Sequence, residues 1–155
     1  MIVNRTYFNK DNEKEIDNIL GNSFSFLRTL KLRGKGSSKF IIHSVSKNLI
    51  HTINKVSDIN YCNIELRPNG IIVNITQQLN LFSIIIPYYK LVIFNSETFS
   101  IHSDGSFIKL LKDKNYLNNK KFIKKMINLK LVLGSTALTT SNASMFCLVQ
   151  TAGAR

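Results

Sequence analysis

From Tyr61 to Leu111 apolar and polar residues alternate along the chain, and this period limits what the chain can fold into. The segment contains the run GIIVNITQQLNLFSIIIP, which is rich in β-branched residues and breaks only at turn-like clusters such as RPNG, TQQLN and SDGS. Alternation with a period of two is typical of β-strands that bury one face. The sequence therefore predicts about six strands with short connections, arranged as an antiparallel meander.

The residues before this segment have the spacing of helices. The run DNEKEIDNIL has acids in its first turn, which predicts a helix capped by Asp11 or Asn12 and ended by Gly21. Residues 23–33 alternate between apolar and polar side chains. They predict either a strand or a helix that continues past Gly21.

Two more segments have helical spacing. The run SVSKNLIHTINKVS predicts a helix near residues 45–56, ahead of the sheet. Residues 115–131 place Phe122, Ile123, Met126 and Ile127 on one stripe with lysines opposite, which predicts a basic amphipathic helix. Together with the strands, these helices predict an α+β domain in which a bent antiparallel sheet is covered by the C-terminal helix.

The composition is that of a folded protein with a strong positive charge. The chain has 155 residues, 44% hydrophobic and 19% charged, which favours one globular domain. Its net charge of +12 favours an anionic partner such as nucleic acid, an anionic membrane or an acidic protein. The abundance of Lys, Asn and Ile also fits AT-rich coding, so the charge has either a functional or a compositional origin.

The sequence favours a soluble cytoplasmic protein. Cys62 and Cys147 are far apart and belong to no motif, which fits a reduced compartment. The first residues, MIVNRTYFNKDNEKE, lack the apolar core of a signal peptide. No uninterrupted apolar run approaches the roughly 20 residues of a transmembrane helix.

Candidate catalytic groups are scarce, so we expect a protein that is not an enzyme and needs no cofactor. His43, His51 and His102 are scattered, with no acids or cysteines spaced to complete a metal site. No pair of acids suggests general acid–base catalysis, and no Ser lies in a GxSxG elbow.

Basic residues provide the main candidates for a binding site. The run RGKGSSK lacks P-loop spacing, so it predicts either a solvated turn or a loose anion contact through Arg33, Lys35 and Lys39. The C-terminal helix adds further anion-binding candidates: Lys120, Lys121, Lys124 and Lys125. If these residues form one stripe with Lys31, the protein could bind nucleic acid. The same helix could instead associate with an anionic membrane surface.

The dipeptide Tyr88-Tyr89 is a second candidate for a binding surface. On a strand its two rings would point to opposite faces, one into the core and one toward a partner.

The order of these elements resembles the second half of a bacterial pleckstrin-homology-like (PH-like) domain. The residues Ile86-Pro87-Tyr88-Tyr89-Lys90-Leu91 match a strand of the form IPY-x-x-I/L, and residues 120–130 match the closing helix. The overall style is similar to that of small uncharacterised Bacteroidota proteins. The resemblance covers about residues 61–131 and implies a PH-like partial barrel. It also implies a module that binds lipids, peptides or other proteins and generally does not catalyse.

The sequence divides into a PH-like α+β domain, residues 1–133, and an atypical segment, residues 134–155. The second segment, GSTALTTSNASMFCLVQTAGAR, has no Lys, Asp, Glu or Ile, in contrast to the rest of the chain. This break in composition predicts a disordered tail of foreign origin.

A chain that ends at Leu133 should therefore melt at nearly the same temperature as the full chain. We expect a change in unfolding free energy within roughly 0.5 kcal/mol, as for positions without buried contacts. Paired thermal melts measure this difference. A loss of several degrees in the shorter chain would show that the removed segment packs on the domain.

Overall fold

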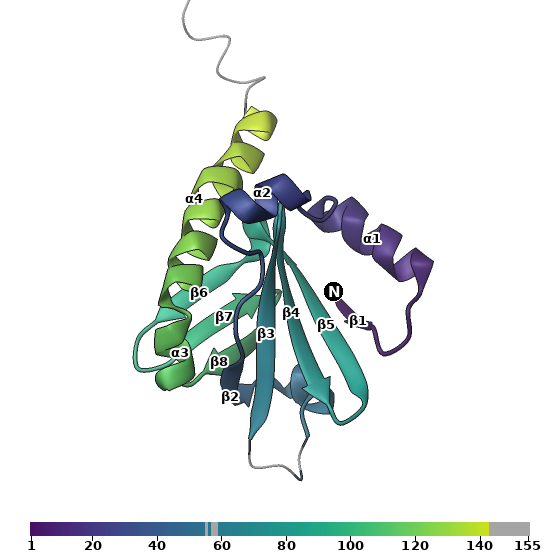
Figure 1. Cartoon of the computed structure of the whole chain (residues 1–155), viewed down its shortest axis with the longest axis vertical. Coiled ribbons are helices and arrows are strands. Elements are labelled where there is room, and N and C mark those ends of the chain that lie inside the picture. The colour runs from purple at the N-terminus through teal and green to yellow at the C-terminus, as the bar shows by residue number, and fades with distance from the viewer. Residues whose placement is uncertain (55, 57–58, 143–155) are drawn as a thin grey trace, which may run out of the picture.

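The computed structural model describes residues 1–54, 56 and 59–142, with residues 134–142 as helix backbone only. Within these residues the chain forms one eight-stranded antiparallel sheet together with helices, which confirms the predicted α+β class (Figure 1). The predicted meander between residues 61 and 111 is present as strands β3 to β8. Two further strands, β1 and β2, were not predicted.

The strands are β1 (Ile2–Asn4), β2 (Phe40–Val45), β3 (Asn60–Arg67), β4 (Gly70–Gln77), β5 (Asn80–Pro87), β6 (Val92–Asn95), β7 (Phe99–Ser103) and β8 (Ser106–Leu110). Their order across the sheet is β1-β5-β4-β3-β2-β8-β7-β6. The sheet thus consists of two meanders, β3–β5 and β6–β8, joined by β2, with β1 added at the edge beside β5.

Strand β2 bends the sheet. Its residues 40–42 pair with β3, whereas its residues 42–45 pair with β8. The register with β8 shifts between Ile42 and Ser44, and a bulge of this kind bends a strand and increases its twist. Figure 1 shows the result, because β3, β4 and β5 run along the long axis of the molecule while β6, β7 and β8 run across it.

The main core fills the concave side of the bent sheet. Ile71, Val73 and Ile75 of β4 point into it, and all three are 0% exposed. Both meanders contribute, and so does the C-terminal helix. Other large members that are fully buried include Phe40, Leu49, Ile64, Leu66, Leu91 and Phe99. Complete burial of each such side chain contributes about 1.5–3 kcal/mol.

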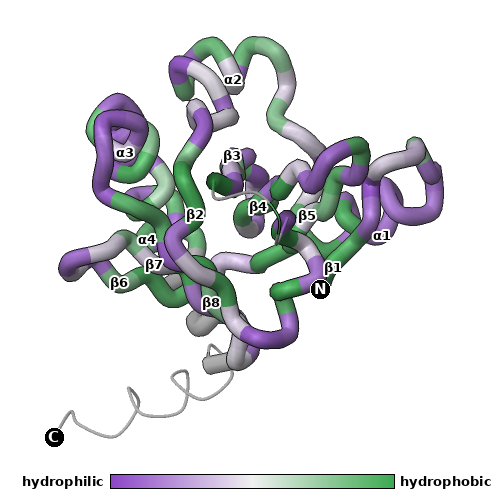
Figure 2. The backbone as a smooth tube through the Cα atoms, turned by 90° about the horizontal axis from the view of Figure 1, so that it is seen from below, coloured by the Kyte–Doolittle hydropathy of each residue, from purple (hydrophilic) through white to green (hydrophobic). Residues whose placement is uncertain are grey.

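A smaller core lies on the reverse face of the sheet, under α1 (Lys10–Leu20). Ile16 and Leu20 of α1 pack on Ile72 and Ile85. Figures 1 and 2 both show α1 on one side of β3–β5 and the C-terminal helix on the other. The helix prediction for this segment is confirmed, but the cap is earlier, since Asn9 accepts the hydrogen bond from the Asp11 amide.

The strand prediction for residues 23–33 is wrong, and so is the alternative of one continuous helix. Helix α1 ends at Gly21, and a separate short helix, α2, spans Phe26–Lys31. A helix of this length provides fewer than two turns. Its residues therefore cannot display a helical period, and their alternation resembles that of a strand.

The helix predicted near 45–56 is also absent. Val45 belongs to β2 and pairs with Ile108, and the next residues form the 3₁₀ helix η1 (Lys47–Thr52). The spacing of Val45 and Leu49 is helical, but pairing with β8 holds the first of these residues in extended backbone. Residues 55, 57 and 58 lie outside the described residues.

The predicted C-terminal helix is divided into α3 (Lys114–Asn118) and α4 (Lys120–Asn142). Between them, buried Asn119 accepts a hydrogen bond from the Ser38 amide at 2.9 Å and donates one to the Asn115 carbonyl at 2.9 Å. Phe122, Ile123 and Met126 of α4 enter the main core. Helix α4 continues past Leu133, and the remainder of the predicted tail, residues 143–155, lies outside the described residues.

Gly70 is required where β4 passes beneath α1. A Cβ at this position would lie 2.7 Å from Leu20 Cδ2 and 2.8 Å from Pro87 Cα, and closer still to the Ile86 carbonyl oxygen. Because backbone atoms cannot move aside, we expect Gly70→Ala to lower the unfolding free energy by roughly 1–3 kcal/mol. Urea denaturation measures the loss.

The matched control is Gly36→Ala, where a Cβ would meet nothing within 4 Å. Its effect should stay within roughly 0.5 kcal/mol. Equal stability of the two variants would contradict the close approach of β5 and of Leu20 to Gly70.

Candidate functional site

The predicted basic residues lie in three places. Lys121, Lys124 and Lys125 line a groove between α2 and α4, with a volume of about 450 Å³. We call this hollow the α2–α4 groove. Its full lining is Arg28, Leu32, Lys121, Lys124, Lys125, Asn128, Leu129, Val132 and Leu133.

Lys125 holds the two sides of the groove together. Its Nζ donates a hydrogen bond to the Gly34 carbonyl at 2.7 Å and approaches the Arg33 carbonyl at 3.5 Å. These carbonyls are presented by the reversal of the chain after α2, where Arg33 and Gly34 both adopt positive φ. Burial lowers the pKa of Lys125. Lys125 is therefore a structural residue, and it is less available to a ligand than its neighbours.

The cations that remain exposed at the groove are Arg28, Lys121 and Lys124. The Arg28 guanidinium lies 4.9 Å from the ring centre of Phe24, which is buried in the main core. This contact orients Arg28 on α2. The sequence prediction missed Arg28, because a strand over residues 23–33 would not have placed it beside the C-terminal helix.

Apolar side chains accompany these cations. Leu32 and Leu129 are partly buried against the main core and form the floor of the groove. Beside it α2 presents Phe26, Leu27 and Leu30, which are 81%, 74% and 67% exposed. Three large apolar side chains on one short helix form an exposed patch that is unusual for a soluble surface. We call these three residues the α2 apolar patch.

The other predicted cations lie elsewhere. Lys35 pairs with Glu65 at 3.2 Å and donates to Ser23 Oγ at 2.6 Å. Lys39 lies 5.5 Å from the ring centre of Tyr61 and adjoins Asn119 at the start of α4. Lys120 is exposed at the same end of α4, away from the groove lining. The structure thus brings together only part of the predicted basic set.

The Tyr88-Tyr89 pair lies on a 3₁₀ helix, η2 (Tyr88–Lys90), rather than on the predicted strand. Tyr88 is buried, and its hydroxyl contacts the Arg67 carbonyl oxygen at 3.3 Å. Burial raises the pKa of Tyr88. Tyr89 is exposed and lies beside Lys90. Only Tyr89 is therefore accessible to a partner.

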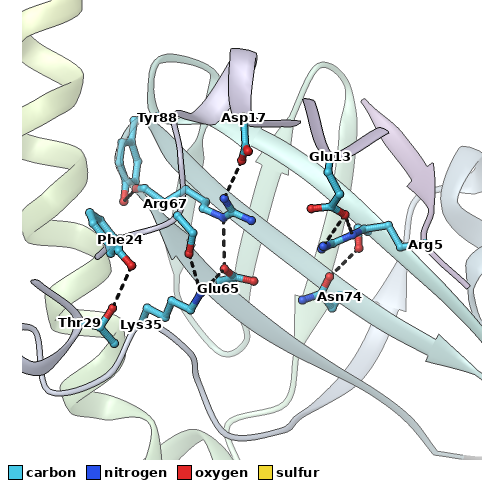
Figure 3. A network of polar contacts seen from close by, with 12 residues as sticks. Arg5, Glu13, Asp17, Phe24, Thr29, Lys35, Glu65, Arg67, Asn74 and Tyr88 are labelled. Carbon is cyan, nitrogen blue, oxygen red and sulfur yellow. Dashed lines mark hydrogen bonds and ion pairs between the residues drawn. The ribbon is translucent and has the colours of Figure 1, made fainter. Parts of the chain in front are cut away.

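A chain of ion pairs crosses the reverse face of the sheet (Figure 3). Arg67 of β3 is 5% exposed and pairs with Asp17 of α1 at 3.0 Å and with Glu65 at 3.2 Å. Lys35 extends the chain from Glu65 to the loop after α2. The Nε of Arg67 makes no hydrogen bond, so Glu65 stabilises it through charge alone. These carboxylates are engaged in structure, which leaves neither available as a general acid or base.

The remaining reactive groups provide no catalytic arrangement among the described residues. Burial raises the pKa of the Cys62 thiol to about 12, which keeps it protonated and unreactive at neutral pH. Burial and the nearby Lys109 lower the pKa of His102. No group of His, Cys, Asp and Glu side chains within the described part of the chain could hold a metal ion.

Comparison of the chain with protein-family models, with curated proteins and with solved structures found no match. None of the helices in the described residues is long and apolar enough to cross a membrane. The site must therefore be interpreted from its own chemistry.

The structural role of Lys125 predicts a difference between two neighbouring lysines. Lys125→Met keeps the aliphatic stem but removes the hydrogen bonds to the loop after α2. We expect its unfolding free energy to fall by about 1 kcal/mol, the usual contribution of such a bond. Lys124→Met, at an exposed position of the same helix, should change stability by no more than about 0.5 kcal/mol. Chemical denaturation of both variants tests this, and equal stabilities would count against the role assigned to Lys125.

Proposed function

We propose that this protein is a non-catalytic binding module of PH-like type. Two features support the proposal: the bent antiparallel sheet built from two meanders, and the C-terminal helix whose apolar side packs against it. Both agree with the architecture that the IPYYKL strand and the helix at 120–130 imply by resemblance. Fold likeness alone does not assign a ligand, so the ligand must be argued from the site.

The observation that carries the proposal is the α2–α4 groove. It combines an apolar floor with the exposed cations Arg28, Lys121 and Lys124. None of these three cations makes an ion pair with an acid of the described chain. A groove of this kind suits a partner that is both anionic and apolar.

The α2 apolar patch favours an anionic membrane surface as that partner. Helix α2 carries Phe26, Leu27 and Leu30 together with the cations Arg28 and Lys31. A membrane interface provides both interactions at once, because apolar side chains enter the acyl boundary while cations meet anionic headgroups. Nucleic acid would satisfy the cations but leave the leucines exposed to water.

Binding to vesicles tests this proposal. The full chain should sediment with phosphatidylcholine vesicles that contain phosphatidylserine and remain free with phosphatidylcholine alone. Lys121→Gln/Lys124→Gln should weaken binding about tenfold or more, since each lysine near an anionic surface contributes about 1 kcal/mol. Leu27→Ser/Leu30→Ser should weaken binding at least as much, because about 0.8 kcal/mol is lost for each buried methylene group.

Matched controls separate this surface from general charge and hydrophobicity. Lys10→Gln/Lys14→Gln removes the same charge from α1 on the reverse face, and Leu79→Ser removes a leucine that is 92% exposed at the β4–β5 turn. Both controls should bind as the unchanged protein does. Equal losses in the control and groove variants would show that binding is unspecific. Binding to a single-stranded oligonucleotide that exceeds vesicle binding and depends on Lys121 and Lys124 would favour nucleic acid instead.

A further inference from the structure

A second hollow lies on the reverse face of the sheet, away from the α2–α4 groove. Its volume is about 440 Å³, within the range of small-molecule sites. Four parts of the chain line it: the segment from β1 into α1, the outer faces of β3 and β4, and Leu81 at the start of β5. Asn63 and Asn74 provide the sheet wall and Asn12 faces them from α1, so we call this hollow the asparagine cleft.

The side chains that line the cleft carry no net charge. Its only two charged side chains, Arg5 and Glu13, neutralise each other through contacts of 2.7 and 2.8 Å, which Figure 3 shows beside Asn74. Helix α1, which forms one wall, carries Lys10 and Lys14 against four Asp and Glu residues. Glu13 and Asp17 are paired with Arg5 and Arg67, so this wall is close to neutral in a chain of net charge +12. A phosphate or carboxylate ligand is therefore disfavoured here.

The cleft does offer uncharged hydrogen-bonding groups. Asn74 Oδ1 accepts a hydrogen bond from Ser83 Oγ at 2.6 Å. The amide protons of Asn74 take no part in this bond and can donate to a ligand. The side-chain amides of Asn12 and Asn63 make no hydrogen bond with any described residue. An asparagine amide both donates and accepts, so these three side chains match a ligand that carries many hydroxyl groups.

Two aromatic rings stand at the mouth of the cleft. Tyr7 and Phe8 are 85% and 77% exposed, although both belong to its lining. Exposed ring faces beside amide groups provide the two interactions that a sugar ring needs. The ring stacks on the C–H face of the sugar, and the amides bind its hydroxyls.

We infer that the asparagine cleft binds a neutral oligosaccharide, with Tyr7 and Phe8 as a stacking platform and Asn12, Asn63 and Asn74 as hydroxyl ligands. Single-stranded nucleic acid also stacks on aromatic rings, but it requires a positively charged groove along its backbone. The cleft does not provide one, because the one cation of its lining, Arg5, is paired with Glu13. The inference uses no residue of the α2–α4 groove, so it stands or fails independently of the proposed membrane contact.

The test is an amide NMR titration of the full chain with three neutral disaccharides: maltose, cellobiose and N,N′-diacetylchitobiose. At least one should shift resonances of residues 5–13, 63 and 74, with a Kd of about millimolar as expected for a small solvated ligand. Tyr7→Ala/Phe8→Ala should weaken that binding about tenfold, because the sugar loses both of the rings on which it stacks. Asn63→Ala should weaken it severalfold.

The control is Tyr89→Ala, which removes another exposed ring from a different face and should leave the affinity unchanged. Three outcomes would overturn the inference. These are no resonance shift with any disaccharide, an equal loss of affinity in the control variant, and resonance shifts confined to the α2–α4 groove. Binding of an uncharged nucleoside in preference to all three sugars, lost in Tyr7→Ala/Phe8→Ala, would also overturn it in favour of base stacking. Preserved amide spectra show that each variant is folded.

Discussion

Strand β4 buries apolar side chains on both of its faces, and each face requires a different covering element. Ile71, Val73 and Ile75 require the concave core, which closes only when β6–β8 and α4 fold across the sheet. Ile72 faces the other way and requires α1. Because a period of two sends neighbouring residues to opposite faces, the run GIIVNI determines both layers of the molecule at once. Gly70 completes this arrangement by allowing Leu20 to approach the start of the strand.

The bend in the sheet follows from how β2 divides its pairing. A strand that pairs with β3 along one half and with β8 along the other must turn between them, and the bulge near Ser44 provides that turn. The turn brings the second meander across the first and creates the concave side that α4 covers. Asn119 completes the junction, since its side chain binds the backbone of residues 38 and 39, just before β2 begins.

The sequence predicted the part of the fold that has a long, regular period. Strands β3–β8 and helix α1 show such periods, and the apolar stripe of Phe122, Ile123 and Met126 indicated the helix that covers the sheet. Helix α2 is too short to display a period, and near the 3₁₀ helix η1 the pairing of Val45 with β8 overrides a helical spacing. Strand β1 is only 3 residues long and is stabilised by its pairing with β5, a contact that local sequence does not encode.

The candidate site was predictable to a similar extent. Lysines 121, 124 and 125 were identified from their place opposite the apolar stripe, and the structure brings all three to one groove. Arg28 and the α2 apolar patch were missed together, because both depend on the assignment of α2. Nothing in the sequence indicated a binding role for Asn63 or Asn74. Asparagine on the outer face of a strand is an ordinary pattern, and only the fold reveals that the two amides face one cleft.

The two hollows lie on opposite faces, and one stretch of chain connects elements that line them. Residues 35–37 run beside β3 through hydrogen bonds from the Leu66 amide to the Lys35 carbonyl and from the Ser37 amide to the Ile64 carbonyl. Just before this stretch, Lys125 binds the Gly34 carbonyl at the groove. Within it, Lys35 joins the ion pairs that reach α1 through Glu65 and Arg67. The position of α2 is therefore set by the same β3 backbone that forms a wall of the asparagine cleft.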